Sequence, residues 1–528
     1  MSIIKSTLNR RRFLVMSGMC LGVLGINACG SLPLATEPSA TSQSETTTGP
    51  RRGGILRMAV SESPSSLDPS INLNQTDTYI GFNLYNRLTR LNEGATDKSI
   101  TPELAESWEI SKDSLSHTFH LRQGVLFQHG TPLTAKDVVY TLERIRNPDI
   151  ASSAQLPAIK AIEAVDEYTV RIDLEAPNVT LPYLLGVQGT EILPHDRTRE
   201  QLEQEPSGTG AFRLQEYHPG EQLIFTPNET YWLSDRPYID QFQLLVMPER
   251  STQITALMNG EVDWLPEVGV VDLPTLQAQA GIQIHVSEQG YYPLFVMDVT
   301  QKPFDDLRVR QAFKHATDRE ALKQVIVGEY GTIHNDQPVV QGTPFWADLP
   351  PLAYDLERAK ELLAEAGYPD GLEVTLSVAE ILPRVVDAAV ILQEMMKAAN
   401  ITVTIDKVSL DTYWAEKYAQ TPFFLDYWPT FSEPDVPLSL AYMAGGSFNV
   451  SNWSDPHLAE LIIQAHGTQD MAARQTLYTE VQELISQEGA VIAPYVPSLL
   501  MATQTKVQGL VAPSLHIRPE EVWLAPEA

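Results

Sequence analysis

FQHGTPLTAKDV, the stretch from residue 127 to residue 138, contains the clearest helix start in the chain. Thr134 is followed three residues later by Asp137, and a hydroxyl residue with an acid at this spacing is typical of a helix N-terminus. Apolar residues then recur at helical spacing: Val138, Val139, Leu142 and Ile145. The stretch therefore predicts an amphipathic helix that packs one face against a core.

Strand and helix signals alternate on both sides of this stretch. Residues 55–60 (ILRMAV) are a short apolar run, while residues 168–174 (YTVRIDL) and 401–405 (ITVTI) alternate apolar and polar side chains, as half-buried strands do. Asp306 and Asp355 each precede apolar residues at helical spacing and are predicted N-caps. The 528 residues therefore predict a mixed α/β fold of several domains.

Composition narrows the class of protein. Lys and Arg number 37 against 67 Asp and Glu, which gives a net charge of −30. Phosphate binding depends on clustered Lys and Arg, so this balance excludes a nucleic-acid partner. The two cysteines, Cys20 and Cys29, both lie in the first thirty residues, which excludes a disulfide framework and a multi-cysteine metal site.

The first fifty residues are predicted to direct export and to tether the protein. Arg10-Arg11-Arg12 precedes the uncharged stretch 13–26, which is too short to span a bilayer and resembles a twin-arginine signal peptide over residues 1–28. The sequence INAC ends at Cys29 and resembles a bacterial lipobox, which implies cleavage before Cys29 and its lipidation. Residues 29–52, rich in Ser, Thr and Pro, are expected to form a flexible linker. An uncleaved N-terminus with a chance cysteine is the alternative.

Known catalytic motifs are absent from the sequence. There is no G-x-S-x-G elbow, no phosphate-binding G-x-x-x-x-G-K-[ST] loop and no H-E-x-x-H helix. The glycine-rich segment 207–210 lacks the lysine of a phosphate loop and is interpreted as a tight connection. The 11 histidines are scattered. We therefore expect no catalytic residue, no metal site and no cofactor.

Eight segments, in order, resemble the large extracytoplasmic solute-binding proteins of peptide and nickel ABC importers. The stretch 127–138 is the most specific of them, and the resemblance covers roughly residues 53–525. The segments are 53–57 with 66–69, 102–108, 118–125 with 127–138, 208–212, 228–232, 259–263, 303–312 and 354–371.

The resemblance implies a two-lobe periplasmic-binding-protein fold of the α/β class (class II-like), with an extra inserted domain and a ligand cleft between the lobes. Hinge bending would close the lobes on the ligand. Carried onto this chain, lobe one comprises residues 53–85, 205–290 and 500–528, the inserted domain 86–204, and lobe two 291–499.

The segment 426–435 (DYWPTFSEPD) resembles the ligand-facing loop of this family. In peptide-binding members an aspartate three residues after the tryptophan takes the amine of the peptide, and here Phe431 stands at that position. Glu433 or Asp435 are the acids that can take its place. The aromatic residues alternatively fill the core of lobe two. The other candidate ligand contacts in this segment are Tyr427, Trp428, Pro429 and Thr430.

Three further segments are candidates for ligand contact. Residues 61–63 follow the first predicted strand, where strand ends of α/β folds meet a ligand, although they also suit a solvated turn. Asn449 and Trp453 form a polar and aromatic patch that follows the loop 426–435. Tyr291 and Tyr292 lie at the predicted crossing into lobe two, where they are either hinge residues or part of the cleft wall. The candidates in the first segment are Ser61, Glu62 and Ser63.

These features predict a monomeric lipoprotein receptor in the periplasm. It would capture oligopeptides or dipeptides outside the cytoplasm and deliver them to an ABC permease in the membrane. A receptor for nickel, a metal chelate or another small solute is the first alternative. An extracytoplasmic peptidase and a holdase-like chaperone are the others.

Overall fold

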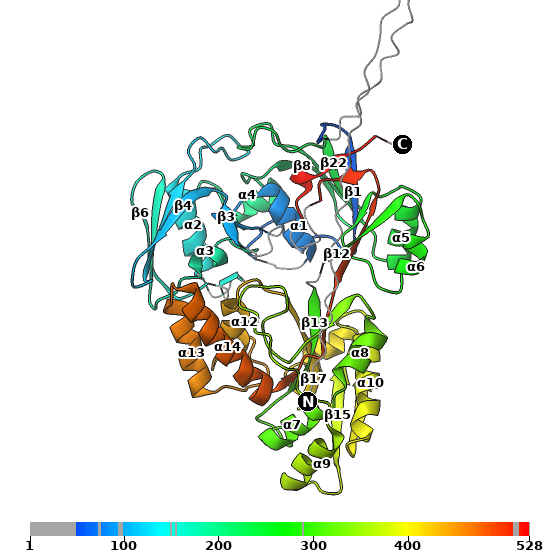
Figure 1. Ribbon diagram of the computed structural model, residues 1–528. Helices are drawn as coiled ribbons and strands as arrows, with labels where there is room; N and C mark the ends of the chain where they lie inside the picture. The colour runs from blue at the N-terminus through cyan, green and yellow to red at the C-terminus, as the bar shows by residue number, and fades with distance from the viewer. Residues whose placement is uncertain are drawn as a thin grey trace, which may run out of the picture. The chain divides into compact units, whose positions relative to one another are not determined.

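The computed structural model describes residues 49–71, 75–92, 99–147, 150, 152–153, 156–287, 290–510 and 517–526 (Figure 1). The predicted signal peptide, Cys29 and most of the predicted linker lie outside the described residues.

A seven-stranded sheet has the strand order β12-β20-β11-β1-β10-β9-β8. Its centre is β1, the apolar run predicted at residues 55–60, which pairs in parallel with β10 on one side and β11 on the other. The strands are β1 (Ile55–Val60), β8 (Phe212–His218), β9 (Gln222–Pro227), β10 (Gln241–Val246), β11 (Trp264–Leu265), β12 (Ile282–Ser287) and β20 (Leu499–Gln504). The elements near this sheet in sequence are α1 (Gln75–Leu84), α4 (Arg199–Gln204), α5 (Arg250–Met258), α6 (Leu273–Gln277), β21 (Val507–Gln508), the 3₁₀ turn η3 (Pro519–Glu521) and β22 (Trp523–Leu524).

Strand directions bring several chain segments to one edge of this sheet. Because β1, β10 and β11 are parallel, their carboxyl ends lie at the same edge. β20 runs antiparallel to β11 and therefore begins at this edge, with Leu499 opposite Ser287, the last residue of β12. The edge thus collects the ends of β1, β8, β10, β11 and β12 and the starts of β9 and β20.

The predicted helix at residues 135–145 packs against a four-stranded antiparallel sheet of order β4-β5-β7-β6. The Thr134 N–H and hydroxyl donate to the Asp137 carboxylate at 2.8 and 3.1 Å, so the predicted cap is confirmed. Val138, Leu142 and Ile145 are fully buried, and Val139 is half-buried. The elements are β2 (Thr89–Leu91), β3 (Ile100–Pro102), β4 (Ala105–Ile110), β5 (Ser116–Leu121), α2 (Ala135–Ile145), β6 (Ile159–Ala164), β7 (Thr169–Leu174) and α3 (Leu181–Leu184).

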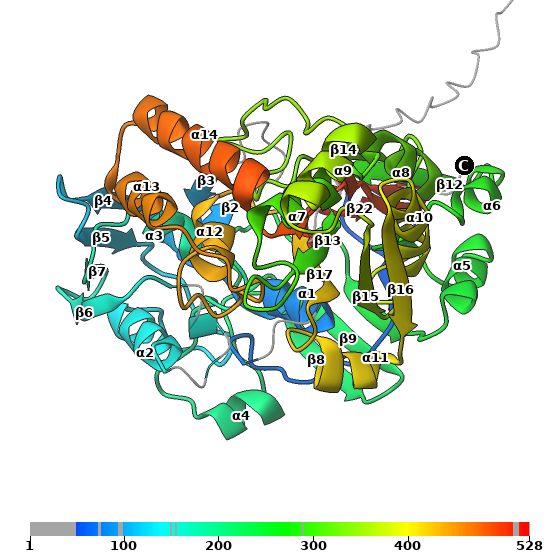
Figure 2. The same cartoon turned by 90° about the horizontal axis from the view of Figure 1, so that it is seen from below.

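A five-stranded sheet of order β16-β15-β17-β13-β18 has its own large core. The predicted strand at 401–405 is confirmed within β16, and helix α10 lies against it (Figure 2). The strands are β13 (Tyr291–Met297), β15 (Leu372–Val378), β16 (Ile401–Lys407), β17 (Phe423–Pro429) and β18 (Val491–Ile492), and a separate pair consists of β14 (Gly331–Ile333) and β19 (Tyr495–Pro497).

Local capping starts the helices around this sheet. Asp306 and Asp355 accept hydrogen bonds from the N–H groups of Arg308 and Arg358 at 2.9 Å, which confirms both predicted caps. Among the described residues, no helix combines the length and apolar character required to cross a bilayer. The helices are α7 (Leu307–His315), α8 (Arg319–Ile326), α9 (Leu356–Glu365), α10 (Val385–Lys397), α11 (Leu410–Thr412), the π-helix η2 (Tyr413–Lys417), α12 (Asp435–Ala441), α13 (Pro456–Gly467) and α14 (Met471–Glu488).

The C-terminal end of α13 contacts the segment around β5 and β7. The Val179 N–H donates to the His466 carbonyl at 2.7 Å, and the Ser114 hydroxyl donates to the Gly467 carbonyl at 3.3 Å. Gln469 donates from its amide to the Ser111 carbonyl at 2.7 Å. Carbonyls in the last turn of a helix lack partners within the helix, so the Val179 and Ser114 contacts satisfy groups that α13 itself cannot.

Two chain crossings connect the seven-stranded sheet with the five-stranded sheet. One runs from β12 to β13 and the other from β18 through β19 to β20, and they lie side by side because Ser287 pairs with Leu499 (Figure 1). A Cβ atom added at Gly290 would lie 2.8 Å from the Pro497 carbonyl oxygen and 3.4 Å from the Leu499 nitrogen. The close approach of the two backbones therefore requires glycine at this position.

Replacing Gly290 with alanine should destabilise the protein by about 1–3 kcal/mol, since the new methyl group forces the two crossings apart. The measurement is the midpoint of urea unfolding followed by tryptophan fluorescence. Gly281→Ala at the start of β12 is the matched control, because its Cβ would meet only Gln504 Oε1 at 3.7 Å. Equal midpoints for the two variants would contradict the close-approach interpretation.

Candidate functional site

The carboxyl edge of the seven-stranded sheet presents polar residues after β1 and β11. Ser61 and Glu62, both predicted site residues, follow β1 and are exposed. The Ser63 hydroxyl accepts a hydrogen bond from the Gly220 N–H at 2.8 Å, which ties this turn to the β8–β9 hairpin. Glu267 follows β11 two residues after its end and is half-buried.

Tyrosines occupy the ends of β13 and β17 beside the crossings. Tyr291 pairs with Pro429, and the rings of Tyr291 and Tyr427 meet edge to face with centroids 5.7 Å apart. Both rings are half-buried. Tyr292 points to the opposite face, where it is buried and its ring lies 4.9 Å from that of His334. Tyr291 and Tyr427 therefore face the junction, whereas Tyr292 belongs to a core.

The segment after β17 carries an aromatic group formed by Trp428, Phe431 and Phe448. Ring centroids of Trp428 lie 5.8 Å from those of Phe431 and 5.9 Å from those of Phe448, and Phe448 is 47% exposed. Thr430 donates from its N–H and its hydroxyl to the Gly290 carbonyl at 3.1 and 2.8 Å, which anchors the segment to the crossing. Trp428 and Phe431 also pack against a cluster drawn from β2, α3 and α12: Leu91, Tyr183, Leu184, Val187, Val436 and Leu440.

Glu433 and Asp435 lie in a buried ionic cluster. Arg474 donates to Glu433 at 2.6 Å and lies 3.8 Å from Asp435, which also accepts from the Tyr478 hydroxyl. Burial raises the pKa of Glu433. Burial acts in the same direction on Asp435, but His466 and Arg474 outweigh it and lower the pKa of Asp435. Both carboxylates thus have internal partners.

Asn449 and Trp453 hold each other within one loop. The Asn449 amide donates to the Trp453 carbonyl at 2.8 Å and to the Met443 carbonyl at 3.2 Å. The Trp453 ring is buried and packs edge to face on Tyr442. Of the residues predicted from sequence, the structure therefore brings Tyr291 and Tyr427 together on one face of the five-stranded sheet and pairs Tyr292 with Trp428 on the other. It gives Asn449 and Trp453 contacts within their own loop.

Sequence reasoning missed Glu267, a half-buried residue at the carboxyl edge of the seven-stranded sheet. Burial raises the pKa of Tyr291 to about 12, and Tyr427 and the charge of Glu267 act in the same direction. Glu267 therefore belongs to the electrostatic surroundings of this tyrosine. The sequence gives little sign of this, because β11 is only 2 residues long and no strand pattern is visible before Glu267.

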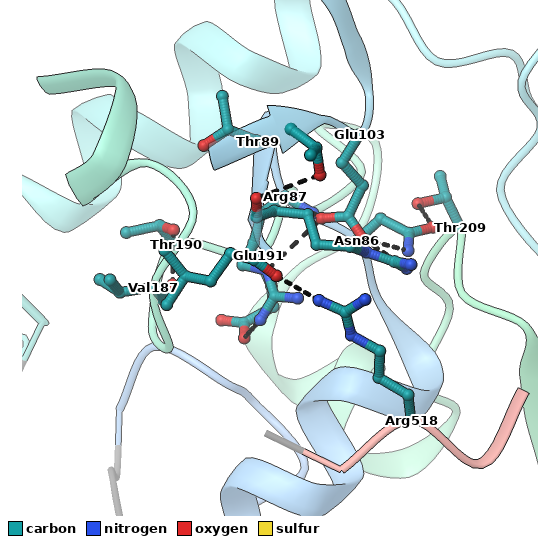
Figure 3. A network of polar contacts seen from close by, with 12 residues as sticks. Asn86, Arg87, Thr89, Glu103, Val187, Thr190, Glu191, Thr209 and Arg518 are labelled. Carbon is teal, nitrogen blue, oxygen red and sulfur yellow. Dashed lines mark hydrogen bonds and ion pairs between the residues drawn. The ribbon is translucent and has the colours of Figure 1, made fainter. Parts of the chain in front are cut away.

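A separate polar network lies where α1 leads into β2 (Figure 3). Arg87 approaches Glu103 at 3.5 Å and Glu191 at 3.6 Å, and Asn86 donates to Glu103 at 3.0 Å. The Thr209 hydroxyl donates to Asn86 at 3.1 Å, so the network ties segment 207–210 to the end of α1. A small open pocket beside it is lined by Phe82, Arg87, Arg90, Leu91, Gly186, Ile517, Arg518 and Glu520.

The glycine-rich segment 207–210 is the tight connection predicted from its sequence. Cβ atoms added at Gly208 or Gly210 would collide with the Leu84 and Asn83 carbonyl oxygens. The segment thus packs directly on the C-terminal backbone of α1. Within the described parts of the chain, no group of three or more His, Cys, Asp or Glu residues is arranged to hold a metal ion.

Two sheets with separate cores, joined by paired crossings that carry aromatic side chains, define a two-lobe binding protein. The model of the bacterial extracellular solute-binding proteins, family 5 (middle part), matches residues 99–450. The chain belongs to this family, and it is an extracytoplasmic solute-binding protein with an α/β two-lobe periplasmic-binding-protein fold.

Several known proteins are similar to this chain over most of its length. Heme-binding protein A of Haemophilus influenzae is 29% identical over 452 residues, which are 78% of this chain and 81% of that protein. Di/tripeptide-binding protein 1 of Pseudomonas aeruginosa is 28% identical and covers 81% and 86%. The periplasmic binding protein DppA of Helicobacter pylori, solved with the peptide STSA, superposes with a TM-score of 0.78, at 26% identity and with 90% and 98% of the two chains covered.

Replacing Arg474 with methionine should destabilise lobe two by about 3–5 kcal/mol, because Glu433 and Asp435 would remain buried without their cation. The measurement is the midpoint of urea unfolding at pH 7. Arg358→Met on the exposed face of α9 is the control and should change stability by no more than about 0.5 kcal/mol. A loss no larger than that of the control would show that the cluster does not depend on Arg474.

Proposed function

We propose that this protein is the peptide-binding lipoprotein of an ABC importer. It binds short peptides in a cleft between its lobes and delivers them to a permease in the cytoplasmic membrane. The observation that supports this function most directly is the group of half-buried aromatic side chains at the ends of β13 and β17, beside the crossings: Tyr291 and Tyr427 on one face of the sheet and Trp428 on the other. Family membership and the relatives whose names specify dipeptides and tripeptides support the same class of ligand.

The lobes correspond to the sheets. In this proposal lobe one is built from residues 53–85, 205–290 and 500–528 around the seven-stranded sheet, and lobe two from 291–499 around the five-stranded sheet. The inserted domain, 86–204, holds the four-stranded sheet. Its last part also serves lobe one, because Leu193 and Leu202 pack in the core of the seven-stranded sheet.

The chemistry of the junction suits a peptide. A ligand enclosed between lobes loses its water, so each of its polar groups needs a partner from the protein. Tyrosine and tryptophan provide large contact areas at low entropic cost together with polar groups at their tips. In the proposed site, Tyr291, Tyr427, Trp428, Pro429, Thr430 and Phe431 contact the ligand from lobe two, and Ser61, Glu62 and Ser63 from lobe one. The remaining candidates do not contact the ligand in this proposal and instead stabilise the segments that carry the contact residues: Tyr292, Glu433, Asp435, Asn449 and Trp453.

The role is capture and delivery rather than turnover. The sequence contains no catalytic motif, and the buried acids of lobe two are paired with Arg474. We further propose that residues 1–28 are a signal peptide, that Cys29 carries the lipid anchor and that the receptor acts as a monomer. The short uncharged stretch 13–26 followed by Cys29 supports the anchor.

Replacing Trp428 with alanine should weaken peptide binding by roughly 2 kcal/mol, or about 30-fold in dissociation constant, because a large half-buried anchor is lost. Isothermal titration with a dipeptide that binds the unmodified protein provides the measurement. Trp414→Ala is the matched control, since this tryptophan of lobe two is 43% exposed and lies on η2, away from the crossings. Unchanged affinity in Trp428→Ala would remove this residue from the site.

Replacing Cys29 with serine should move the protein from the membrane fraction to the soluble fraction, because serine cannot form the thioether that carries the lipid. Fractionation followed by immunoblotting provides the measurement, with the unmodified protein as the control. Persistence of the variant in the membrane fraction would contradict the assignment of Cys29 as the lipidated residue.

A further inference from the structure

We infer that Glu267 binds the ammonium group of the peptide ligand, from lobe one. The inference rests on the proposed function and specifies which charge the site selects. The ammonium group is either the free amine at the start of the peptide or the side chain of a lysine within it.

The position of Glu267 follows from strand directions. β1 and β11 are parallel neighbours, so the residues after β11 lie at the edge of the seven-stranded sheet from which both crossings depart. The Val268 N–H donates to the Leu500 carbonyl at 2.7 Å, which fixes the backbone next to Glu267 against the second crossing. The first crossing lies on the other side of the second, with Gly290 against Pro497 and Leu499. Glu267 is thus held beside the point where Tyr291 enters lobe two.

The carboxylate of Glu267 has no hydrogen bond or ion pair with any of the residues that the structure describes. Arg250 acts on it electrostatically: its Nε donates to Asp272 at 2.6 Å, and its buried Nη2 has no hydrogen-bond partner among the described residues. Burial nevertheless raises the pKa of Glu267 more than Arg250 lowers it. A half-buried carboxylate without a direct partner costs stability, and a ligand cation would relieve that cost.

The surroundings of Glu267 suit an ammonium group. Tyr291 from β13 and Tyr427 from β17 meet edge to face, and both rings are half-buried. Tyrosine rings attract cations through their faces, and their hydroxyls can accept hydrogen bonds from an ammonium group. A half-buried carboxylate at the edge of one sheet and two half-buried tyrosines at the ends of β13 and β17 therefore offer the groups that a single positive charge requires.

The other acids near the junction differ from Glu267. Phe431 stands where a lobe-two aspartate would be expected, and Glu433 and Asp435 are paired with Arg474. Glu62 is exposed after β1 and therefore gains less from a ligand cation than a half-buried carboxylate does. Asp426 in β17 is buried without a cation, but it accepts hydrogen bonds from the Tyr427 N–H at 2.8 Å and the Tyr418 hydroxyl at 3.3 Å. Among the described acids at this junction, Glu267 combines partial burial with the lack of a direct hydrogen bond.

The test is calorimetric titration of the full-length protein in detergent with peptides AF, AKA and STSA (one-letter code) and with their N-acetylated forms. We expect the unmodified protein to bind AF at least about tenfold more tightly than acetyl-AF. Glu267→Gln should lose this preference, and its ligand-free melting temperature should stay the same or rise, because the variant removes a carboxylate that burial disfavours. A purely structural residue would lower the melting temperature instead. Glu261→Gln, an exposed glutamate on the connection between α5 and β11, should behave like the unmodified protein.

Acetyl-AKA distinguishes the two sources of the charge. If the unmodified protein binds acetyl-AKA but not acetyl-AF, and Glu267→Gln binds neither, the lysine side chain supplies the ammonium group. Equal affinity of the unmodified protein for AF and acetyl-AF, or an unchanged preference in Glu267→Gln, would overturn the inference while leaving peptide binding intact. Failure of the unmodified protein to bind any of the peptides would instead reject the proposed function, and this inference with it.

Discussion

The close approach of Gly290 to Pro497 is the constraint on which the rest of the junction depends. The absent side chain lets the two crossings lie side by side, and three other segments are positioned relative to them. Thr430 donates twice to the Gly290 carbonyl and so anchors the aromatic segment that follows β17. Val268 is bonded to Leu500, at the start of β20, and so places Glu267. Tyr291 begins β13 immediately after Gly290. Side chains that are far apart in sequence are therefore brought together by backbone contacts at a single place.

The parts of this architecture that are readable from sequence are those whose signals are local. The caps at Thr134, Asp306 and Asp355 are each satisfied within three residues, so residue type and spacing were sufficient to predict the helices that follow. The site depends instead on distant pairings. β11 has 2 residues and is a strand only because Trp264 pairs with Met58 and Thr503, so nothing before Glu267 indicated a strand end. The pairing of Glu433 with Arg474 crosses about forty residues, and the sequence could not show which of the two was its partner: a ligand or an internal arginine.

Buried acids in this strongly acidic chain are mostly accompanied by cations. Asp68 accepts from Arg144 at 3.0 Å, Glu103 from Arg90 at 3.1 Å and Asp336 from Arg319 at 2.6 Å. Such pairs offset the cost of removing a carboxylate from water, and breaking one leaves a buried charge uncompensated. Asp298 and Asp426 are buried without a cation but accept hydrogen bonds, whereas the half-buried Glu267 has neither kind of partner among the described residues. A polar group of a receptor that has no partner within the protein can gain one from a ligand, so such groups are candidates for ligand contact.

The contacts between α13 and the segments around β5 and β7 have a consequence for the lifetime of the bound complex. Val179, Ser114 and Gln469 fasten the two segments together through backbone carbonyls, at positions separate from the aromatic side chains beside the crossings. In the proposed domain arrangement, separation of the lobes would have to break these bonds, whatever the ligand. Their strength would then add a barrier to opening beside the barrier from the ligand itself. Dissociation can be made slower or faster by changes at this distant contact, while the choice among ligands stays with the residues that touch them.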